Sequence, residues 1–214
     1  MVPPLVGGSH GVSGQNCWSV NYSIRRVCLL RGSSVDIVST YTHPSDYKIT
    51  KAFWFKGKTL RDLKDDSEYT GRVEYDGNKD NYHTLRITDL RETDSAEYKF
   101  RMITDKDGKY GDSLGVQLTL TGLKVKVTPA TVTEGQSVTL TCSSTCPLPG
   151  NTSYTWYKNN QTRTETQQKL LYLDSVGSED AGRYSCAVTE HQHLRSPEET
   201  LNVTCKTQTP TVYN

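Results

Sequence analysis

Two cysteines and one tryptophan in the second half of the chain have a spacing that few folds accommodate. Cys142 ends the alternating apolar segment GQSVTLTC, Trp156 follows 14 residues later, and Cys186 ends the segment GRYSC. Tyr184 stands two residues before the second cysteine, in the order Asp-x-Gly-x-Tyr. This pattern is typical of an immunoglobulin sandwich, in which a disulfide joins the two sheets over the tryptophan and the tyrosine ties a corner to the backbone. We therefore predict a Cys142–Cys186 disulfide.

The first half of the chain repeats this pattern without the cysteines. Residues 85–100, LRITDLRETDSAEYKF, contain the same tyrosine motif at Tyr98. Trp54 lies in the segment KAFWFKGK, which is expected to form the third strand with its tryptophan pointing inward. Phe100 stands where the second cysteine would be. The chain between Trp54 and residues 85–100 is long enough for two additional strands, which predicts a variable-type (V-type) sandwich.

The two halves together predict an all-β protein made of two tandem immunoglobulin-like β-sandwiches. A chain of 214 residues has room for two domains of about 100 residues each. The predicted organisation is a disordered N-terminal segment at 1–15, a V-type domain at 16–121, a C2- or I-type domain at 123–205 and the start of a stalk at 206–214. The second sandwich is of the C2 or I type because the chain between its tryptophan and the next predicted strand is too short for the C″ strand of a V-type domain.

The composition excludes several classes of function. The chain has 25 Lys and Arg residues against 24 Asp and Glu, so it lacks the basic excess that non-specific nucleic-acid binding requires. No run of 18 apolar residues, the length that would suggest a membrane span, occurs. The six cysteines do not have the paired spacing with histidine that zinc sites show. Disulfides are therefore expected, and neither a metal nor a cofactor is.

Sequons and disulfides together predict the compartment. Four N-x-S/T sequons predict N-glycosylation at Asn21, Asn151, Asn160 and Asn202. Disulfides form in oxidising compartments, so we expect an extracellular ectodomain of a plasma-membrane protein. No catalytic residue is predicted, because the chain has no Gly-x-Ser-x-Gly elbow and the two histidines of the segment HQH are too few for a metal site.

The segment around Tyr98 predicts a charged side chain on an outer sheet face. Side chains alternate along a strand, so Tyr98 and Phe100 point into the sandwich and Arg101 points out. An outward guanidinium can hold a planar anion through two parallel hydrogen bonds. An anion-binding site at Arg101 is therefore one hypothesis for this sheet.

The same sheet face gives a second hypothesis. Phe53 and Phe55 flank the inward Trp54 and are expected to face out, and Ile103 is expected to face out beside Arg101. Exposed apolar side chains that lie together often mark a surface for a protein partner. The sequence leaves both hypotheses open.

The segment EYKFR, which ends at Arg101, resembles the V-set domain of the siglecs, the sialic-acid-binding immunoglobulin-like lectins. The resemblance implies that Arg101 forms a salt bridge with the sialic acid carboxylate, that Trp18 packs on the N-acetyl methyl group and that Tyr110 stacks on the glycerol tail. Tyr110 stands nine residues past Arg101, where the family usually has tryptophan. The phrases TYTHPS, GRVEY and LRITDLRE make the chain most similar to the fish B-cell-type members.

The resemblance also implies a partner and a mode of binding. The partner would be sialylated glycans on cell-surface glycoproteins or glycolipids, bound at about −4 kcal/mol, so that adhesion requires clustering. The segment GKTLRDLKDDSEYTG would set the linkage specificity. The family's disulfide within one sheet of the first domain would fall at Ser39 and His83, neither of which is a cysteine.

The remaining cysteines can be placed on the two predicted sandwiches. Cys28 lies at the lower end of the first and Cys146 at the facing end of the second, which predicts an interdomain disulfide, a device that siglecs also have. Cys17 lies near one tip and Cys205 near the opposite end, too far apart for the separation of about 6 Å between Cα atoms that a disulfide needs. Either cysteine could instead join two copies in a homodimer.

Overall fold

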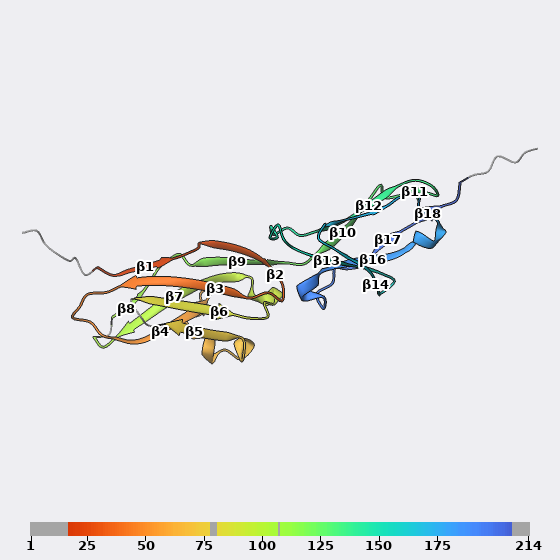
Figure 1. Ribbon diagram of the computed structural model, residues 1–214. Helices are drawn as coiled ribbons and strands as arrows, with labels where there is room; N and C mark the ends of the chain where they lie inside the picture. The colour runs from red at the N-terminus through yellow and green to blue at the C-terminus, as the bar shows by residue number, and fades with distance from the viewer. Residues whose placement is uncertain (1–16, 78–80, 107, 207–214) are drawn as a thin grey trace, which may run out of the picture. The chain divides into compact units, whose positions relative to one another are not determined.

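The computed structural model describes residues 17–77, 81–106 and 108–206 (Figure 1). The predicted terminal segments, 1–15 and 206–214, lie outside this range apart from Lys206. The described chain consists of β-strands and short 3-10 turns, with no α-helix, so the predicted all-β class is confirmed. Within these ranges no helix is long and apolar enough to cross a membrane.

Two sheets form the first sandwich. One has the order β1-β3-β6-β5, with β1 at Ser19–Tyr22, β3 at Val35–Thr42, β6 at Tyr82–Ile87 and β5 at Val73–Gly77. The other has the order β2-β9-β7-β4, with β2 at Arg26–Leu30, β9 at Val116–Thr121, β7 at Ala96–Thr104 and β4 at Ile49–Lys56. A short strand, β8 at Lys109–Gly111, also pairs with β7.

The core between these sheets is built around Trp54 on β4. The centroid of its ring lies 5.7 Å from that of Tyr22 and 5.6 Å from that of Phe100, and all three side chains are buried. Phe100 stacks on Tyr41 with 5.4 Å between ring centroids. The aromatic ring therefore occupies the place expected for a cysteine, as the alternation along this strand predicted.

Ser39 and His83 lie buried in the same core. The indole Nε1 of Trp54 donates a hydrogen bond to Nδ1 of His83 at 2.9 Å. Burial lowers the pKa of His83 to about 4, so the imidazole is neutral at pH 7 and can accept this bond. The hydroxyl of Ser39 is fully buried and has no hydrogen-bond partner among the described residues. Of the two positions that hold the family's disulfide, His83 is therefore bonded to Trp54 and Ser39 has no partner in the described chain.

The chain after β4 differs from the prediction. Residues 57–72 contain no strand, so the two additional strands expected there are not formed and β4 is the outer strand of its sheet. Two 3-10 turns take their place, η1 at Leu63–Asp65 and η2 at Ser67–Tyr69. The side chains of Asp62 and Asp66 accept hydrogen bonds from the backbone N–H groups two residues on, at 3.1 Å each. Aspartates that bond their own backbone in this way favour turns over strands.

The second sandwich has the predicted arrangement of cysteines and tryptophan. One sheet has the order β10-β12-β15, with β10 at Lys124–Thr128, β12 at Val138–Ser143 and β15 at Leu170–Leu173. The other has the order β14-β13-β16-β17, with β14 at Gln161–Thr166, β13 at Tyr154–Lys158, β16 at Gly182–Val188 and β17 at Glu199–Leu201. A parallel pair, β11 at Val132–Thr133 and β18 at Val203–Thr204, completes the set.

The disulfide predicted between the two sheets of this sandwich is present. Cys142 and Cys186 form a disulfide, and Trp156 is fully buried in the same core. The hydroxyl of Tyr184 donates to the carbonyl of Asp180 at 2.7 Å, which is the corner that the sequence motif predicted. Both the disulfide and the tyrosine corner are therefore confirmed.

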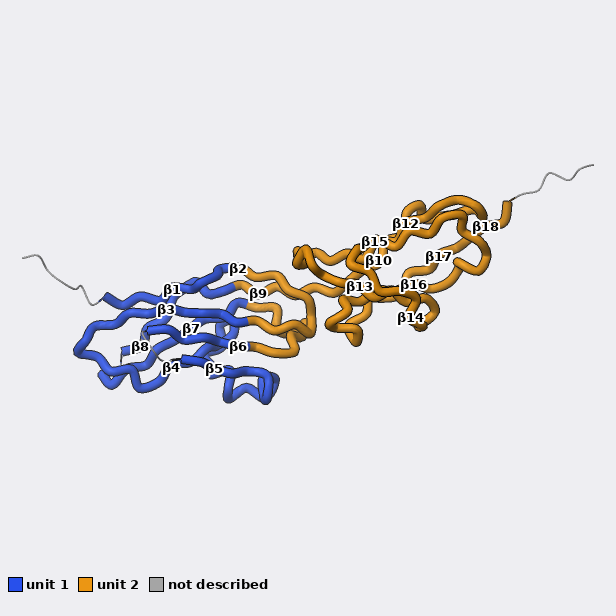
Figure 2. The backbone as a smooth tube through the Cα atoms, viewed as in Figure 1, with its two compact units in different colours: residues 1–25, 36–86, 97–116 blue, residues 26–35, 87–96, 117–214 orange. Residues whose placement is uncertain are grey.

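Figure 2 shows the two compact units into which the chain divides. Unit 1 contains residues 1–25, 36–86 and 97–116, and unit 2 contains residues 26–35, 87–96 and 117–214. The boundaries of these units do not fall at the domain boundary predicted at 121–123. The domain bounds expected from the sequence therefore stay a prediction. Within unit 2, Cys28 and Cys146 form the second predicted disulfide.

Candidate functional site

Arg101 lies near the centre of β7 on the outer face of its sheet. Its direct cross-strand neighbours are Phe53 on β4 and Gly111 on β8. The residue is half-buried. No hydrogen bond or ion pair joins its guanidinium to any residue in the described ranges. The charge of Arg101 is therefore not balanced by an acidic side chain of the described chain, while the stem of the side chain lies against the sheet.

The neighbouring lysines differ from Arg101 because each has a carboxylate partner. Lys51 Nζ lies 2.9 Å from an oxygen of Asp62, and Lys99 Nζ lies 3.1 Å from an oxygen of Glu97. The hydrogen bond from the Gly115 N–H is the main cause that lowers the pKa of Glu97, and the bond from Lys99 adds to it. On this face the lysine charges are therefore balanced, and the charge of Arg101 is available to a ligand.

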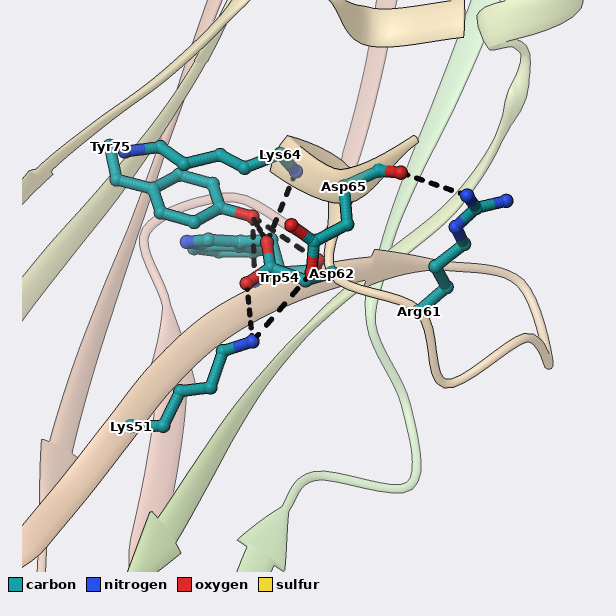
Figure 3. Close-up of polar contacts among 7 residues, drawn as sticks. All are labelled: Lys51, Trp54, Arg61, Asp62, Lys64, Asp65 and Tyr75. Atoms are coloured by element: carbon teal, nitrogen blue, oxygen red, sulfur yellow. Dashed lines mark hydrogen bonds and ion pairs between the residues drawn. The ribbon is translucent and has the colours of Figure 1, made fainter. Parts of the chain in front are cut away.

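A polar network fastens the segment after β4 to that strand, and Figure 3 shows its members. The Tyr75 hydroxyl donates to Asp62 at 2.7 Å and accepts from the Trp54 backbone N–H at 3.2 Å. Asp62 also accepts from the backbone N–H of Lys64 and from Lys51. Burial acts to raise the pKa of Asp62, but the bonds from Tyr75 and Lys51 lower it below its ordinary value. The carboxylate therefore stays ionised and holds Lys51 beside the sheet face.

Phe53 and Phe55 are not exposed, which corrects the prediction of an outward apolar face. They are 5% and 7% exposed. Their cross-strand neighbours are Arg101 and Lys99, whose long side chains start from the same face beside the rings. The ammonium of Lys51 also lies 4.9 Å from the centroid of the Phe53 ring. Of the three candidate residues for protein pairing, only Ile103 is partly exposed.

Trp18 and Tyr110 lie in contact at one end of unit 1. Their rings stack with 5.5 Å between centroids and an interplanar angle of 23°. Tyr47 meets Trp18 almost at a right angle, with 5.1 Å between centroids, and His43 lies 6.2 Å from it. These four half-buried residues, Trp18, His43, Tyr47 and Tyr110, are called the aromatic cluster below.

Strand register places Arg101 and the aromatic cluster on different faces of one sheet. Tyr110 pairs with Met102, which is fully buried, so its side chain starts on the inner face. Gly111 pairs with Arg101, so β8 has no side chain on the outer face at the position beside Arg101. A Cβ atom at Gly111 would lie 3.9 Å from the Cβ of Arg101. A ligand that touches both Arg101 and Tyr110 must therefore cross the bare backbone at Gly111.

Sequence reasoning missed two members of this region, Gly111 and Tyr47. A glycine directly after Tyr110 in KYGD was a usable signal for Gly111, because glycine in a strand marks a close approach of another group. Nothing in the spacing of Tyr47 indicates its contact with Trp18, since Trp18 directly precedes β1 and Tyr47 lies between β3 and β4.

The four sequon asparagines, Asn21, Asn151, Asn160 and Asn202, are exposed, as glycosylation requires. Asn21 pairs with Thr40 in the sheet formed by β1 and β3. Val20 and Tyr22, on either side of Asn21, are buried, so Asn21 points outward from that sheet and not from the sheet of Arg101. Cys17 and Cys205, the two free cysteines, are both exposed. No group of three or more metal-ligating side chains is present in the described ranges.

Comparisons with known proteins agree with this fold. Residues 30–122 match the family described as "B-cell receptor CD22-like, first Ig-like", and residues 122–209 match the family described as "Immunoglobulin domain". B-cell receptor CD22 of Mus musculus is 36% identical over 92 residues, which are 41% of this chain and 10% of CD22. The chain thus spans about a tenth of the length of this curated relative.

A solved structure with a similar fold is that of the three N-terminal domains of the bacteriophage RB49 highly immunogenic outer capsid protein, Hoc. It has a TM-score of 0.54 and 14% identity, and the match covers 88% of this chain and 58% of Hoc. This likeness concerns the fold alone. The chain therefore consists of two tandem immunoglobulin domains, and its first domain is similar to the first immunoglobulin domain of B-cell receptor CD22.

Proposed function

We propose that the chain is part of the extracellular region of an immunoglobulin-superfamily receptor, of the siglec type found on B cells, and that its first domain binds sialylated glycans. The observation that carries the proposal is Arg101, a partly buried residue of the outer sheet face whose guanidinium has no anionic partner in the described chain. A sialic acid carboxylate matches this group in charge and in planar geometry. Similarity of the first domain to that of CD22 supports the proposal.

The binding is weak at a single site. A bidentate arginine–carboxylate pair at a partly wet surface contributes about 1–3 kcal/mol. With a few further contacts the total is about −4 kcal/mol, a millimolar dissociation constant. Receptors clustered on a cell surface bind through many such sites at once, which raises the overall affinity.

The proposed location is outside the cell, on the plasma membrane. The two disulfides, Cys28–Cys146 and Cys142–Cys186, and the exposed sequon asparagines support it. The exposed Cys17 and Cys205 are available for a disulfide between two copies. A homodimer joined in this way would itself present two Arg101 sites.

The alternative function, protein binding through Phe53, Phe55 and Ile103, has less support. The burial of both phenylalanines removes most of the apolar surface that such a partner would cover. No observation in the structure favours this alternative over anion binding.

The test is binding of a clustered, multivalent ectodomain to an array of sialylated glycans. Arg101→Ala should abolish binding, and Arg101→Lys should weaken it because lysine cannot form the bidentate pair. Arg86→Ala is a matched control, since Arg86 is an exposed arginine of the other sheet, paired with Asp36 at 3.3 Å. Sialidase treatment of target cells should remove the binding of the unaltered protein. Equal binding by the unaltered and Arg101→Ala proteins would refute the proposal.

A further inference from the structure

The connection between β3 and β4 is fixed to the chain that follows β7. The backbone N–H of Lys48 donates to the carboxylate of Asp105 at 3.0 Å, and the N–H of Asp105 donates to the carbonyl of Lys48 at 3.0 Å. Tyr47 closes a turn by donating its N–H to the carbonyl of Pro44 at 3.1 Å. The connection is therefore held in one place, with Tyr47 next to the reciprocal pair of bonds.

The ring of Tyr47 is supported on more than one side. The ammonium of Lys106 lies 4.9 Å from the ring centroid and also pairs with Asp46 at 3.2 Å. A Cβ atom at Gly108 would lie 3.5 Å from Cε1 of Tyr47, so the ring fills the space beside that glycine. This support fixes the ring that contacts Trp18.

Trp18 makes two aromatic contacts of different geometry. Tyr110 covers one face of the indole by stacking at 5.5 Å, and Tyr47 meets it at 70°. Aromatic pairs in such offset-stacked and perpendicular arrangements are stabilising beyond the area they bury. Trp18 and Tyr110 therefore form one stacked pair, called the platform below, and not the two separate contact surfaces that the resemblance implied.

We infer that Tyr47 is a positioning residue that sets the orientation of Trp18 in this platform. The effect of Tyr47 on glycan binding rests on the proposed function, whereas its effect on the orientation of Trp18 does not. The platform receives one apolar group of the glycan that Arg101 binds, and Tyr47 acts on that recognition through Trp18. No bond from the Tyr47 hydroxyl to a residue in the described ranges is present, so the ring alone carries the effect.

The positioning can be tested without any ligand, by acrylamide quenching of tryptophan fluorescence. Trp54 and Trp156 are 0% exposed, so quenching in the folded protein reports Trp18. Tyr47→Ala should raise the quenching constant, and Tyr47→Phe should leave it unchanged. Tyr172→Ala removes an exposed tyrosine of the second domain and is the control. Thermal unfolding identifies any variant that fails to fold, and Tyr47→Leu then replaces Tyr47→Ala.

The second measurement is binding of the same variants to the glycans that the unaltered protein binds through Arg101. Tyr47→Ala should weaken binding about three- to tenfold, the effect of losing one aromatic pair. Tyr47→Phe should retain it, and Tyr47→Ala combined with Trp18→Ala should bind no more weakly than Trp18→Ala alone.

The two measurements separate the failure of this inference from the failure of the proposed function. Unchanged quenching in the folded Tyr47→Ala variant overturns the positioning role, whatever the protein binds. Unchanged glycan binding by that variant overturns its part in recognition. If the unaltered protein bound glycans no better than Arg101→Ala, the proposed function would be refuted. The quenching result would then decide the positioning role by itself.

Discussion

His83 is neutral in the core of the first sandwich, so we predict that lowering the pH reduces the free energy of unfolding of this domain through the titration of His83. Its pKa is lowered from 6.5 to about 4 by burial in the folded protein. Between these two values the unfolded chain binds a proton that the folded domain excludes, so the free energy of unfolding falls as the pH falls. Above pH 6.5 neither state is protonated, and this loss is absent.

The size of the loss follows from the two pKa values. At pH 5 the linkage relation gives a loss of at most about 2 kcal/mol. Because solvent screens part of the charge at the edge of the ring, we expect about 1–2 kcal/mol. His83→Gln keeps an acceptor for the Trp54 Nε1 hydrogen bond but does not titrate in this range.

Urea unfolding at pH 7 and pH 5 measures the effect. Hydrogen exchange read on peptides from β7 follows the first domain separately from the second. The unaltered protein should lose about 1–2 kcal/mol more than His83→Gln between the two pH values. Parallel behaviour of the two proteins would refute the reasoning. The carboxylates of Asp62 and Glu97 do not interfere, because their lowered pKa values place their contribution at more acid pH.

Three further substitutions have defined outcomes. Ser39→Ala removes a buried hydroxyl that has no partner in the described chain and should raise the free energy of unfolding by about 0.5–1 kcal/mol; a decrease in urea unfolding would contradict this. Gly111→Ala brings a Cβ to 2.9 Å from the Phe100 carbonyl, so β8 must move, and glycan binding should fall while the second domain keeps its unfolding profile. Tyr184→Phe removes the bond to the Asp180 carbonyl and should cost about 1 kcal/mol in thermal unfolding of the second domain, whereas an unchanged midpoint would show that the corner is dispensable.

The parts of the fold that sequence predicted are those fixed by local spacing. The tyrosine corner at Tyr184 and the Cys142–Cys186 clamp follow from strand alternation and from separations along the chain. The same alternation gave the inward direction of Phe100. Such features need no knowledge of what lies on the other side of a sheet.

The parts that sequence did not predict depend on what packs over a strand. Alternation gave the direction of Phe53 and Phe55 but not their burial beside the long side chains of Lys51, Lys99 and Arg101. Chain length between Trp54 and the next motif allowed strands, but the aspartate caps selected 3-10 turns. The contact between Trp18 and Tyr110 joins two sheets through their ends, and no spacing along the chain encodes it.

The hydrogen bond between the Trp54 backbone and the Tyr75 hydroxyl protects an open sheet edge from pairing with another copy of the chain. β4 is the last strand of its sheet, and an open strand edge can pair with the edge of another chain. At the middle of that edge the backbone N–H of Trp54 is already bonded to Tyr75, whose hydroxyl also lies 3.3 Å from the Trp54 carbonyl. A neighbouring strand therefore finds no free donor at Trp54, and two copies of this domain brought close together resist joining edge to edge at this point.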